Sequence, residues 1–279
     1  MSVTTIACAQ LPLDIEDHDI NFKLTTGAIK EACSKGADII VLPELASSGY
    51  MFESIEEARS RSELLNGKTI TAWSKALAGT NAVVIGGFCE DGEDGNLYNS
   101  VVLVTANGAE HVYRKVHLWG SEQLYFKPGD KAPAVIKTVH GRVAISVCYD
   151  AYFPEFARAV ALAGAQLFVL PTNAPRNIPG EASPPASFGD TPMQLKIWSA
   201  MAHVNGMFVA GCDRCGPERG VDWVGASAIF DNYGLMLAEH PEDFGSGLLF
   251  AECDLPAADN KVRGSRNDLL KDRRPDLYS

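Results

Sequence analysis

Residues 142–155 have the sequence Arg142-Val-Ala-Ile-Ser-Val-Cys-Tyr-Asp-Ala-Tyr-Phe-Pro-Glu155, and this stretch predicts how the chain folds. Its first half alternates β-branched apolar residues, which is typical of a buried strand. Its last two residues, a proline and a glutamate, are typical of the first turn of a helix, where proline fits and a carboxylate meets the positive end. Cys148 therefore lies where a strand passes into a helix, as in α/β proteins.

Cys148 is placed where a thiol can react. The backbone N–H groups that follow it, together with the coming helix, can lower the pKa of a thiol and hold an oxyanion. An isolated cysteine at the end of an apolar strand is more often inert packing, because free cysteine behaves as a small hydrophobe. A catalytic role therefore depends on the partners that the rest of the chain supplies.

The composition limits the class of protein. The chain has 279 residues, of which 46% are hydrophobic, so it can bury a large core. Its formal net charge of -11 disfavours nucleic acid and anionic membranes as partners, because both need a basic face. The seven cysteines are odd in number and widely spread, which favours reduced thiols and a cytoplasmic location. No apolar run approaches the ~18 residues of a membrane span, so we expect a small molecule as the partner.

Apolar strand-like runs alternate with helical stretches along the chain, and this alternation predicts an α/β fold. The runs at residues 82–89 and 98–105 flank a turn-rich segment and predict a hairpin. The stretches at residues 21–34 and 192–205 are the clearest helices. Other expected strands are residues 6–10, 38–42, 111–115, 207–212, 226–230 and 248–253.

The sequence contains an internal repeat. Residues 36–43, Gly-Ala-Asp-Ile-Ile-Val-Leu-Pro, resemble residues 164–171, Gly-Ala-Gln-Leu-Phe-Val-Leu-Pro. Each copy follows a helical segment, with the glycine placed as the stop of that helix. Each strand then delivers polar residues, Glu44 in the first copy and Asn173 in the second, at the edge where open α/β sheets build their sites. The repeat predicts two similar halves.

Two further stretches carry side chains suited to chemistry. Glu44 directly follows an apolar strand, where partial desolvation would raise its pKa and suit a general base. Strand alternation places Lys115 on one face with Tyr113, where the ammonium needs an anionic partner. Both residues could instead be ordinary, as a solvated strand end and a surface ion pair. Glu122 follows in a loop, where glutamates are usually only solvated.

Three motifs occur in order along the chain: Leu42-Pro-Glu44 with Gly49-Tyr50, Tyr113-Arg-Lys-Val-His-Leu118 with Glu122, and Cys148-Tyr-Asp150 with Phe153-Pro-Glu155. Together they resemble the nitrilase superfamily of carbon–nitrogen hydrolases, and the similarity covers nearly the whole chain. The resemblance implies one domain over residues 1–279 with a four-layer α-β-β-α sandwich, and a homodimer. The highly charged residues 259–279 are predicted to form a C-terminal arm, either packed on another surface or frayed.

The resemblance also implies a Glu-Lys-Cys triad of Glu44, Lys115 and Cys148, with no metal and no cofactor. In such a triad Glu44 takes the thiol proton, while Lys115 and the backbone N–H of Tyr149 hold the oxyanion. Glu122 resembles the family's second glutamate, which positions the substrate or the attacking water. These four side chains are the predicted catalytic residues.

Four residues are expected to bind substrate: Tyr50, Tyr149, Asn173 and Arg176. The last two follow the second repeat strand and could line a pocket, with Arg176 as a candidate partner for a substrate carboxylate. Specificity is expected to depend on the loops at residues 54–67 and 177–190.

Two features complicate the assignment. An arginine is frequent in the family directly before Phe-Pro-Glu, whereas this chain has Tyr152, which leaves the substrate open. Asp150 is expected to brace the turn against an arginine such as Arg158 rather than react.

The pair Cys212 and Cys215 could suggest a zinc or redox site, but no second pair exists and a Gly-Pro follows instead of a helix.

The sequence leaves four functions open. The first hypothesis is an amidase that converts a small aliphatic primary amide, such as an ω-amide of the 2-oxoglutaramate kind, to a carboxylate and ammonia through a thioester. A nitrilase or an N-carbamoyl amidohydrolase would use the same triad. A non-catalytic binding protein on the same fold is the alternative from another class.

Overall fold

The computed structural model describes residues 3–178, 187–188, 191–240 and 244–278. The helices are α1 (His18–Ser34), α2 (Ile55–Ser60), α3 (Lys68–Ala76), α4 (Glu122–Tyr125), α5 (Pro154–Leu162) and α6 (Met193–Asn205), with 3₁₀ turns η1 (Cys148–Tyr152) and η3 (Leu255–Asp259). Short strands outside the two main sheets are β9 (Pro175–Asn177), β10 (Ser187–Phe188), β11 (Thr191–Pro192), β13 (Pro217–Glu218) and β14 (Val221–Trp223).

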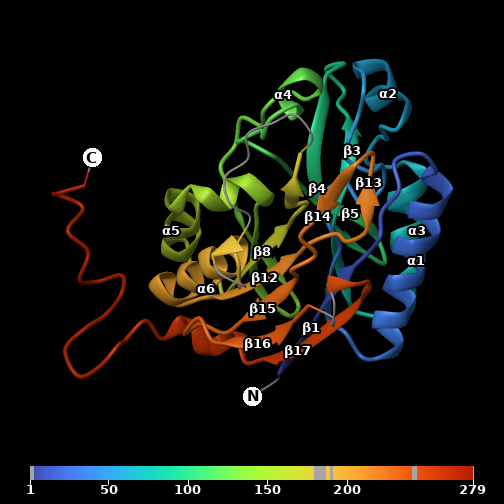
Figure 1. The fold of residues 1–279 in the computed structure, drawn as a ribbon. Coiled ribbons are helices and arrows are strands. Elements are labelled where there is room, and N and C mark those ends of the chain that lie inside the picture. The colour runs from blue at the N-terminus through green and yellow to red at the C-terminus, as the bar shows by residue number, and fades with distance from the viewer. Residues whose placement is uncertain (1–2, 179–186, 189–190, 241–243, 279) are drawn as a thin grey trace.

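Two six-stranded sheets form the body of the molecule (Figure 1). The first has the order β17 (Gly247–Cys253), β1 (Thr4–Gln10), β2 (Ile39–Val41), β3 (Val83–Asp91), β4 (Leu97–Thr105) and β5 (Gly108–Arg114). The second has the order β16 (Met236–Glu239), β15 (Ala228–Phe230), β12 (Phe208–Cys212), β8 (Leu167–Pro171), β7 (Gly141–Ile145) and β6 (Val135–Thr138). The predicted hairpin is confirmed, since β3 and β4 pair antiparallel.

The two repeat strands take equivalent places in the two sheets. β2 pairs in parallel with β1 on one side and β3 on the other. β8 likewise pairs in parallel with β7 and β12. Gly36 and Gly164, which precede these strands, have φ of 81° and 89°, a conformation that glycine adopts without steric cost. The prediction of two similar halves is confirmed.

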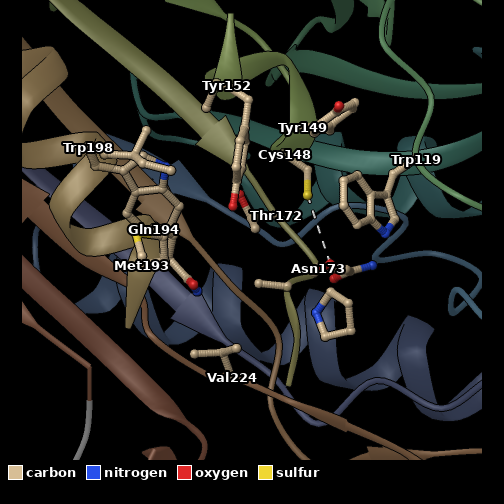
Figure 2. Close-up of a pocket in the computed structure, with 14 residues that line it drawn as sticks. Trp119, Cys148, Tyr149, Tyr152, Thr172, Asn173, Met193, Gln194, Trp198 and Val224 are labelled. Atoms are coloured by element: carbon tan, nitrogen blue, oxygen red, sulfur yellow. Dashed lines mark hydrogen bonds between the residues drawn. The ribbon is translucent and has the colours of Figure 1, made fainter. Parts of the chain in front are cut away.

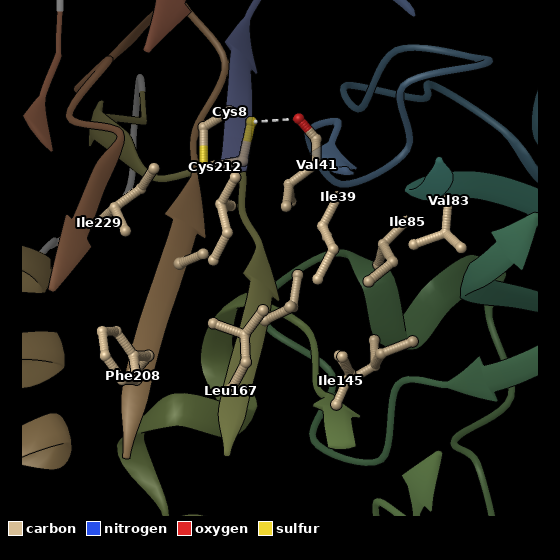
Figure 3. Close-up of a cluster of buried hydrophobic side chains, with 14 of the residues drawn as sticks. Cys8, Ile39, Val41, Val83, Ile85, Ile145, Leu167, Phe208, Cys212 and Ile229 are labelled. Atoms are coloured by element: carbon tan, nitrogen blue, oxygen red, sulfur yellow. Dashed lines mark hydrogen bonds between the residues drawn. The ribbon is translucent and has the colours of Figure 1, made fainter. Parts of the chain in front are cut away.

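The sheets pack face to face and helices cover both outer faces. The inner side chains of the two sheets, such as Ile39 and Leu167, meet in one fully buried core (Figure 3). Burying one such side chain stabilises the fold by roughly 1.5–3 kcal/mol. α1 and α3 pack on the outer face of the first sheet, and α5 and α6 on that of the second (Figure 1). The predicted four-layer α-β-β-α sandwich is confirmed.

The C-terminal segment leaves the four layers after η3. Lys261 fixes its start, because Nζ donates to the carbonyl oxygens of Asn205 and Gly206 at 3.1 and 2.8 Å. Beyond this anchor the chain runs away from the body (Figure 1), and Leu277 and Tyr278 are 69% and 55% exposed. Within the described ranges, no helix combines the length and the apolar character that crossing a membrane requires.

Candidate active site

Four chain segments that follow strands meet at one edge of the sandwich. Glu44 follows β2, Lys115 follows β5, Cys148 follows β7 and Asn173 follows β8. The β2 and β8 segments come from different sheets and contact each other directly: Asn173 N donates to Glu44 Oε2 at 2.9 Å, and Asn173 Nδ2 donates to the Glu44 carbonyl at 2.8 Å. The site therefore depends on the face-to-face packing of the two halves.

A buried charge cluster forms the floor of the site. The Lys115 ammonium lies 2.8 Å from Glu44 Oε1 and 2.6 Å from Glu122 Oε1, and all three side chains are almost completely buried. Asn99 Nδ2 donates a further bond to Glu44 Oε1 at 2.7 Å, and the Tyr50 hydroxyl donates to Glu122 Oε1. One ammonium thus faces two carboxylates, so the cluster readily holds one more proton.

Burial sets the acid–base properties of this cluster. Desolvation raises the pKa of Glu44 to about 7, although the neighbouring Lys115 opposes this shift. Burial alone would lower the pKa of Lys115, but Glu122 and Glu44 raise it well above its ordinary value. Lys115 therefore stays charged, while Glu44 can both take up and release a proton near neutral pH.

Cys148 lies at a strained turn directly above the cluster. Its φ of 43° is unusual for a residue with a Cβ, and such strain is kept where surrounding structure enforces it. The Sγ atom donates to the Asn173 carbonyl at 3.9 Å (Figure 2). Burial, reinforced by Glu44, raises the pKa of the Cys148 thiol well above its ordinary value, while Lys115 lowers it. The resting thiol therefore needs a base, and Glu44 interacts with it electrostatically.

Asp150 holds the Cys148 turn in place, but not in the predicted way. Its Oδ2 accepts bonds from Val147 N at 3.1 Å and from the Tyr113 hydroxyl at 2.8 Å. Arg158 instead donates to the Val204 carbonyl at 2.8 Å, so the expected brace between Asp150 and Arg158 is wrong. The reason is geometric, because Arg158 lies on α5 beyond the turn and reaches the end of α6.

A cavity of about 80 Å³ opens over Cys148. Figure 2 shows Cys148 and Trp119 on one side and Gln194 with Met193 on the other, with Thr172 between them. The remaining lining residues are mostly apolar: Tyr149, Ala151, Tyr152, Asn173, Ala174, Pro175, Ile197, Trp198 and Val224. An engineered apolar cavity that binds benzene has roughly 150 Å³, so the enclosed part suits a small molecule.

Two of the four predicted binding residues line the described part of the cavity, and two do not. Tyr149 and Asn173 line the cavity, whereas Tyr50 lies behind Glu122 with its ring edge-on to Trp223. Arg176 also lies outside the described lining: Nη2 donates to the Val224 carbonyl at 3.3 Å, and the guanidinium is 5.7 Å from the Phe244 ring centroid. Most of the loop at residues 177–190 falls outside the described residues.

Sequence reasoning missed several polar residues of the site. Asn99 is a polar residue within the apolar strand β4, and Gln194 is a polar residue in the first turn of the largely apolar helix α6. Both are buried, and a polar side chain at a position that is expected to be buried could have drawn attention to them. Trp119 follows the lysine motif and donates its backbone N–H to Glu122 at 3.3 Å.

The model of the carbon–nitrogen hydrolase family matches residues 5–260. The chain belongs to this family. The protein is therefore a nitrilase-superfamily enzyme, a hydrolase that acts on carbon–nitrogen bonds.

Similar proteins span the same length. A protein named nitrilase from Pyrococcus abyssi is 34% identical, covering 98% of both chains. An (R)-stereoselective amidase from a Pseudomonas species is 33% identical over 92% of this hydrolase and 87% of that chain. Among solved structures, a mutant of the amidase from Nesterenkonia sp. AN1 has a TM-score of 0.78 at 26% identity, covering 98% and 95%. That structure carries the acetamide moiety of fluoroacetamide on its active-site cysteine.

Proposed function

We propose that this hydrolase is an amidase that converts a small aliphatic primary amide to a carboxylate and ammonia through a thioester on Cys148. The observation that carries the proposal is the buried cluster of Glu44, Lys115 and Glu122 next to a thiol that opens into a small cavity. A thiol, a base and a fixed cation at one point are the parts that acyl transfer needs.

In the acylation step Glu44 takes the proton of Cys148, and the thiolate attacks the amide carbonyl carbon. The ammonium of Lys115 and the backbone N–H of Tyr149 stabilise the oxyanion that forms. The N–H of Tyr149 is suited to this because the first residues of a helical turn have no intrahelical acceptor. Glu44 then gives its proton to the departing nitrogen, the C–N bond breaks, and ammonia leaves a thioester on Cys148.

In the deacylation step water attacks the thioester. Glu44, again unprotonated, takes a proton from the water. The C–S bond then breaks to release the carboxylic acid, and Glu44 returns its proton to the departing sulfur, which restores the thiol and the free base. Glu122 supports both steps as a positioning residue, because Lys115 Nζ, the Tyr50 hydroxyl and Trp119 N all donate to it. This arrangement keeps the ammonium fixed while the charge on Glu44 changes.

The residues that line the cavity limit which acyl group the substrate can carry. An ω-amide such as 2-oxoglutaramate carries a carboxylate, and a buried carboxylate needs a cationic partner. Arg176 was the candidate for that partner, but it is not among the described lining residues, and its guanidinium donates to the Val224 backbone carbonyl and lies 5.7 Å from the Phe244 ring centroid. We therefore propose a short acyl chain without a carboxylate.

The first experiment is ammonia release from a panel of small amides, nitriles and carbamoyl compounds. Removal of the nucleophile in Cys148→Ala should lower kcat/KM by at least about 10³-fold, the order that loss of a catalytic nucleophile causes. Cys33→Ala is a matched control, because this thiol lies in the last turn of α1 on the outside of the sandwich. It should keep full activity.

The products separate the possible functions. Ammonia alone from amides supports an amidase, preference for nitriles supports a nitrilase, and ammonia with carbon dioxide supports an N-carbamoyl hydrolase. Intact mass of the quenched wild-type protein should show the acyl group on the cysteine. Turnover that survives Cys148→Ala would overturn the thioester proposal, and no turnover of any compound would favour a binding protein.

A further inference from the structure

Asp213 is a buried carboxylate that the mechanism above does not use. It follows β12 and is completely buried. Its Oδ1 accepts bonds from Ala174 N at 3.0 Å and Arg214 N at 2.9 Å, and its Oδ2 accepts bonds from Ala226 N at 3.2 Å and Gln194 Nε2 at 2.9 Å. Two of these partners, Ala174 and Gln194, line the cavity over Cys148. Asp213 therefore supports the wall of the cavity from behind.

These contacts fix the orientation of the Gln194 amide. An ionised carboxylate can only accept hydrogen bonds, so Gln194 must turn its NH₂ group toward Asp213. Burial raises the pKa of Asp213 to about 7, while its backbone N–H donors oppose that shift, so the carboxylate is ionised in mildly alkaline solution. With one N–H of Nε2 donated to Asp213, the Oε1 atom is the acceptor that the amide offers to a ligand in the cavity.

Like Gln194, Thr172 offers a hydrogen-bond acceptor to the cavity. Thr172 also lines the cavity, and its hydroxyl donates its proton to the Leu170 carbonyl at 3.1 Å. The oxygen of such a hydroxyl can only accept a further bond. The Oε1 atom of Gln194 and the hydroxyl oxygen of Thr172 are thus both acceptors, and a bound molecule satisfies these two atoms by donating.

The lining also lacks charge. The described lining residues beside Gln194 include no Asp, Glu, Lys, Arg or His, and the charged cluster of Glu44, Lys115 and Glu122 lies on the Cys148 side of the site. Apolar groups of Met193, Ile197 and Trp198 border Gln194 on the α6 side. Placing a charge there without a partner is strongly unfavourable, whereas a neutral donor matches the acceptors.

We propose that the acyl part of the substrate is uncharged and carries a hydrogen-bond donor, which the Oε1 atom of Gln194 accepts. Neutral hydroxy-amides fit this description, since they present an O–H group on the acyl side of the reacting carbonyl. The inference rests on the proposed amidase function and specifies its substrate class. Gln194 is thereby a specificity-determining residue.

The test compares isosteric amides that differ only in a donor. Glycolamide and propionamide exchange a hydroxyl for a methyl group, as do 3-hydroxypropionamide and butyramide. For at least one pair we expect wild-type kcat/KM to favour the donor by about 10-fold or more, the effect of one hydrogen bond of ~1.4 kcal/mol. The anionic amide malonamate and the cationic β-alaninamide should be at least about 10-fold poorer than butyramide.

Two variants then test whether the preference for a hydrogen-bond donor depends on the Oε1 atom of Gln194. Gln194→Met keeps the volume but removes the acceptor, so the preference for the donor, measured as the ratio of kcat/KM within each pair, should fall to about 1. Met193→Leu is the matched control, because it changes an adjacent lining side chain without changing a polar group, and the preference should persist.

The outcomes of these comparisons test the proposed substrate class separately from the proposed amidase function. An unchanged preference in Gln194→Met, a wild-type preference for the methyl isosteres, or equal turnover of charged amides would overturn it. If Gln194→Met does not fold, the wild-type comparison within each pair still decides. Failure of the proposed function looks different, because then no amide yields ammonia in a reaction that depends on Cys148.

Discussion

At the scale of single residues, the chemistry depends on how burial changes the charge of Glu44. A solvated glutamate has a pKa of roughly 4.3 and would be a weak base for a thiol. The completely buried Glu44 has a pKa raised to about 7 by desolvation, against the effect of Lys115. The same burial raises the pKa of Cys148. In the proposed mechanism the proton therefore moves from Cys148 to Glu44, two groups that both bind a proton more tightly than they would in water.

This predicts a pH dependence with a definite sign. Glu44 acts as a base only when it is unprotonated, and its pKa is raised to about 7. The value of kcat/KM should therefore fall tenfold per pH unit below about 7 and level off above it. Glu44→Gln, which keeps the shape but cannot take a proton, should lower kcat/KM by about 10²–10⁴-fold.

The measurement is a pH profile of kcat/KM for butyramide in the wild type and in Glu44→Gln. The profile belongs to the coupled cluster as a whole, since Lys115 and Glu122 interact with Glu44. A profile that stays flat from pH 5 to 8 would contradict the assignment of Glu44 as the base.

At the scale of secondary-structure elements, β3 controls where Glu44 lies. Gly87 N donates to the Pro43 carbonyl at 3.0 Å, which ties the segment after β2 to β3. A Cβ on Gly87 would lie 2.3 Å from Leu45 N and 2.6 Å from Glu44 Cα. Only a glycine in β3 allows this close approach, so the position of the base depends on the neighbouring strand.

Gly87→Ala should therefore disable the enzyme. The clash is with backbone atoms, so the Glu44 segment must move, and a displacement of about 1 Å can lower the rate about 10²-fold. Gly27→Ala is the control, because a Cβ at this site in α1 meets nothing within 4 Å. That change should leave activity intact and raise the free energy of unfolding by about 0.5–1 kcal/mol.

Both variants are compared by kcat/KM and by urea unfolding. Loss of activity in Gly27→Ala would show that the assay reports general damage. Full activity and unchanged stability in Gly87→Ala would mean that the close approach of β3 to Glu44 is not required.

At the scale of the whole molecule, the C-terminal arm at residues 259–279 is the part that the sandwich does not cover. Leu277 and Tyr278 are largely exposed, and the chain carrying them extends away from the layers (Figure 1). Exposed apolar side chains on an extended segment are suited to packing on another surface. We propose that this surface belongs to a second copy of the chain in a homodimer.

If the chain forms this homodimer, light scattering should give a mass of twice the 30.0 kDa of one chain. Replacing both Leu277 and Tyr278 with serine should weaken association at least about 10-fold. Val139→Ser is the control, since this apolar side chain is 81% exposed and lies between β6 and β7 instead of on the arm. A monomeric wild type, or a dimer that the double substitution leaves unchanged, would contradict the proposal.

The sequence by itself determined the layered fold and the catalytic candidates. Alternating apolar strands and helices predicted the α/β class, and the repeat at residues 36–43 and 164–171 predicted the two halves, because these patterns are local and periodic. Glu44, Lys115 and Cys148 could be named because the motifs around them resemble those of the family's Glu-Lys-Cys triad. Their motifs then gave the family.

Only the tertiary structure decided which polar residues share the site. Asp213 follows β12 and Gln194 lies on α6, and the bond between them depends on how the second sheet packs against its helix. Arg176 follows the same strand as Asn173 but points elsewhere, since side-chain direction depends on packing neighbours that are distant in sequence. Burial, which sets the pKa of Glu44 and the polarity of the cavity, is likewise a property of the assembled layers.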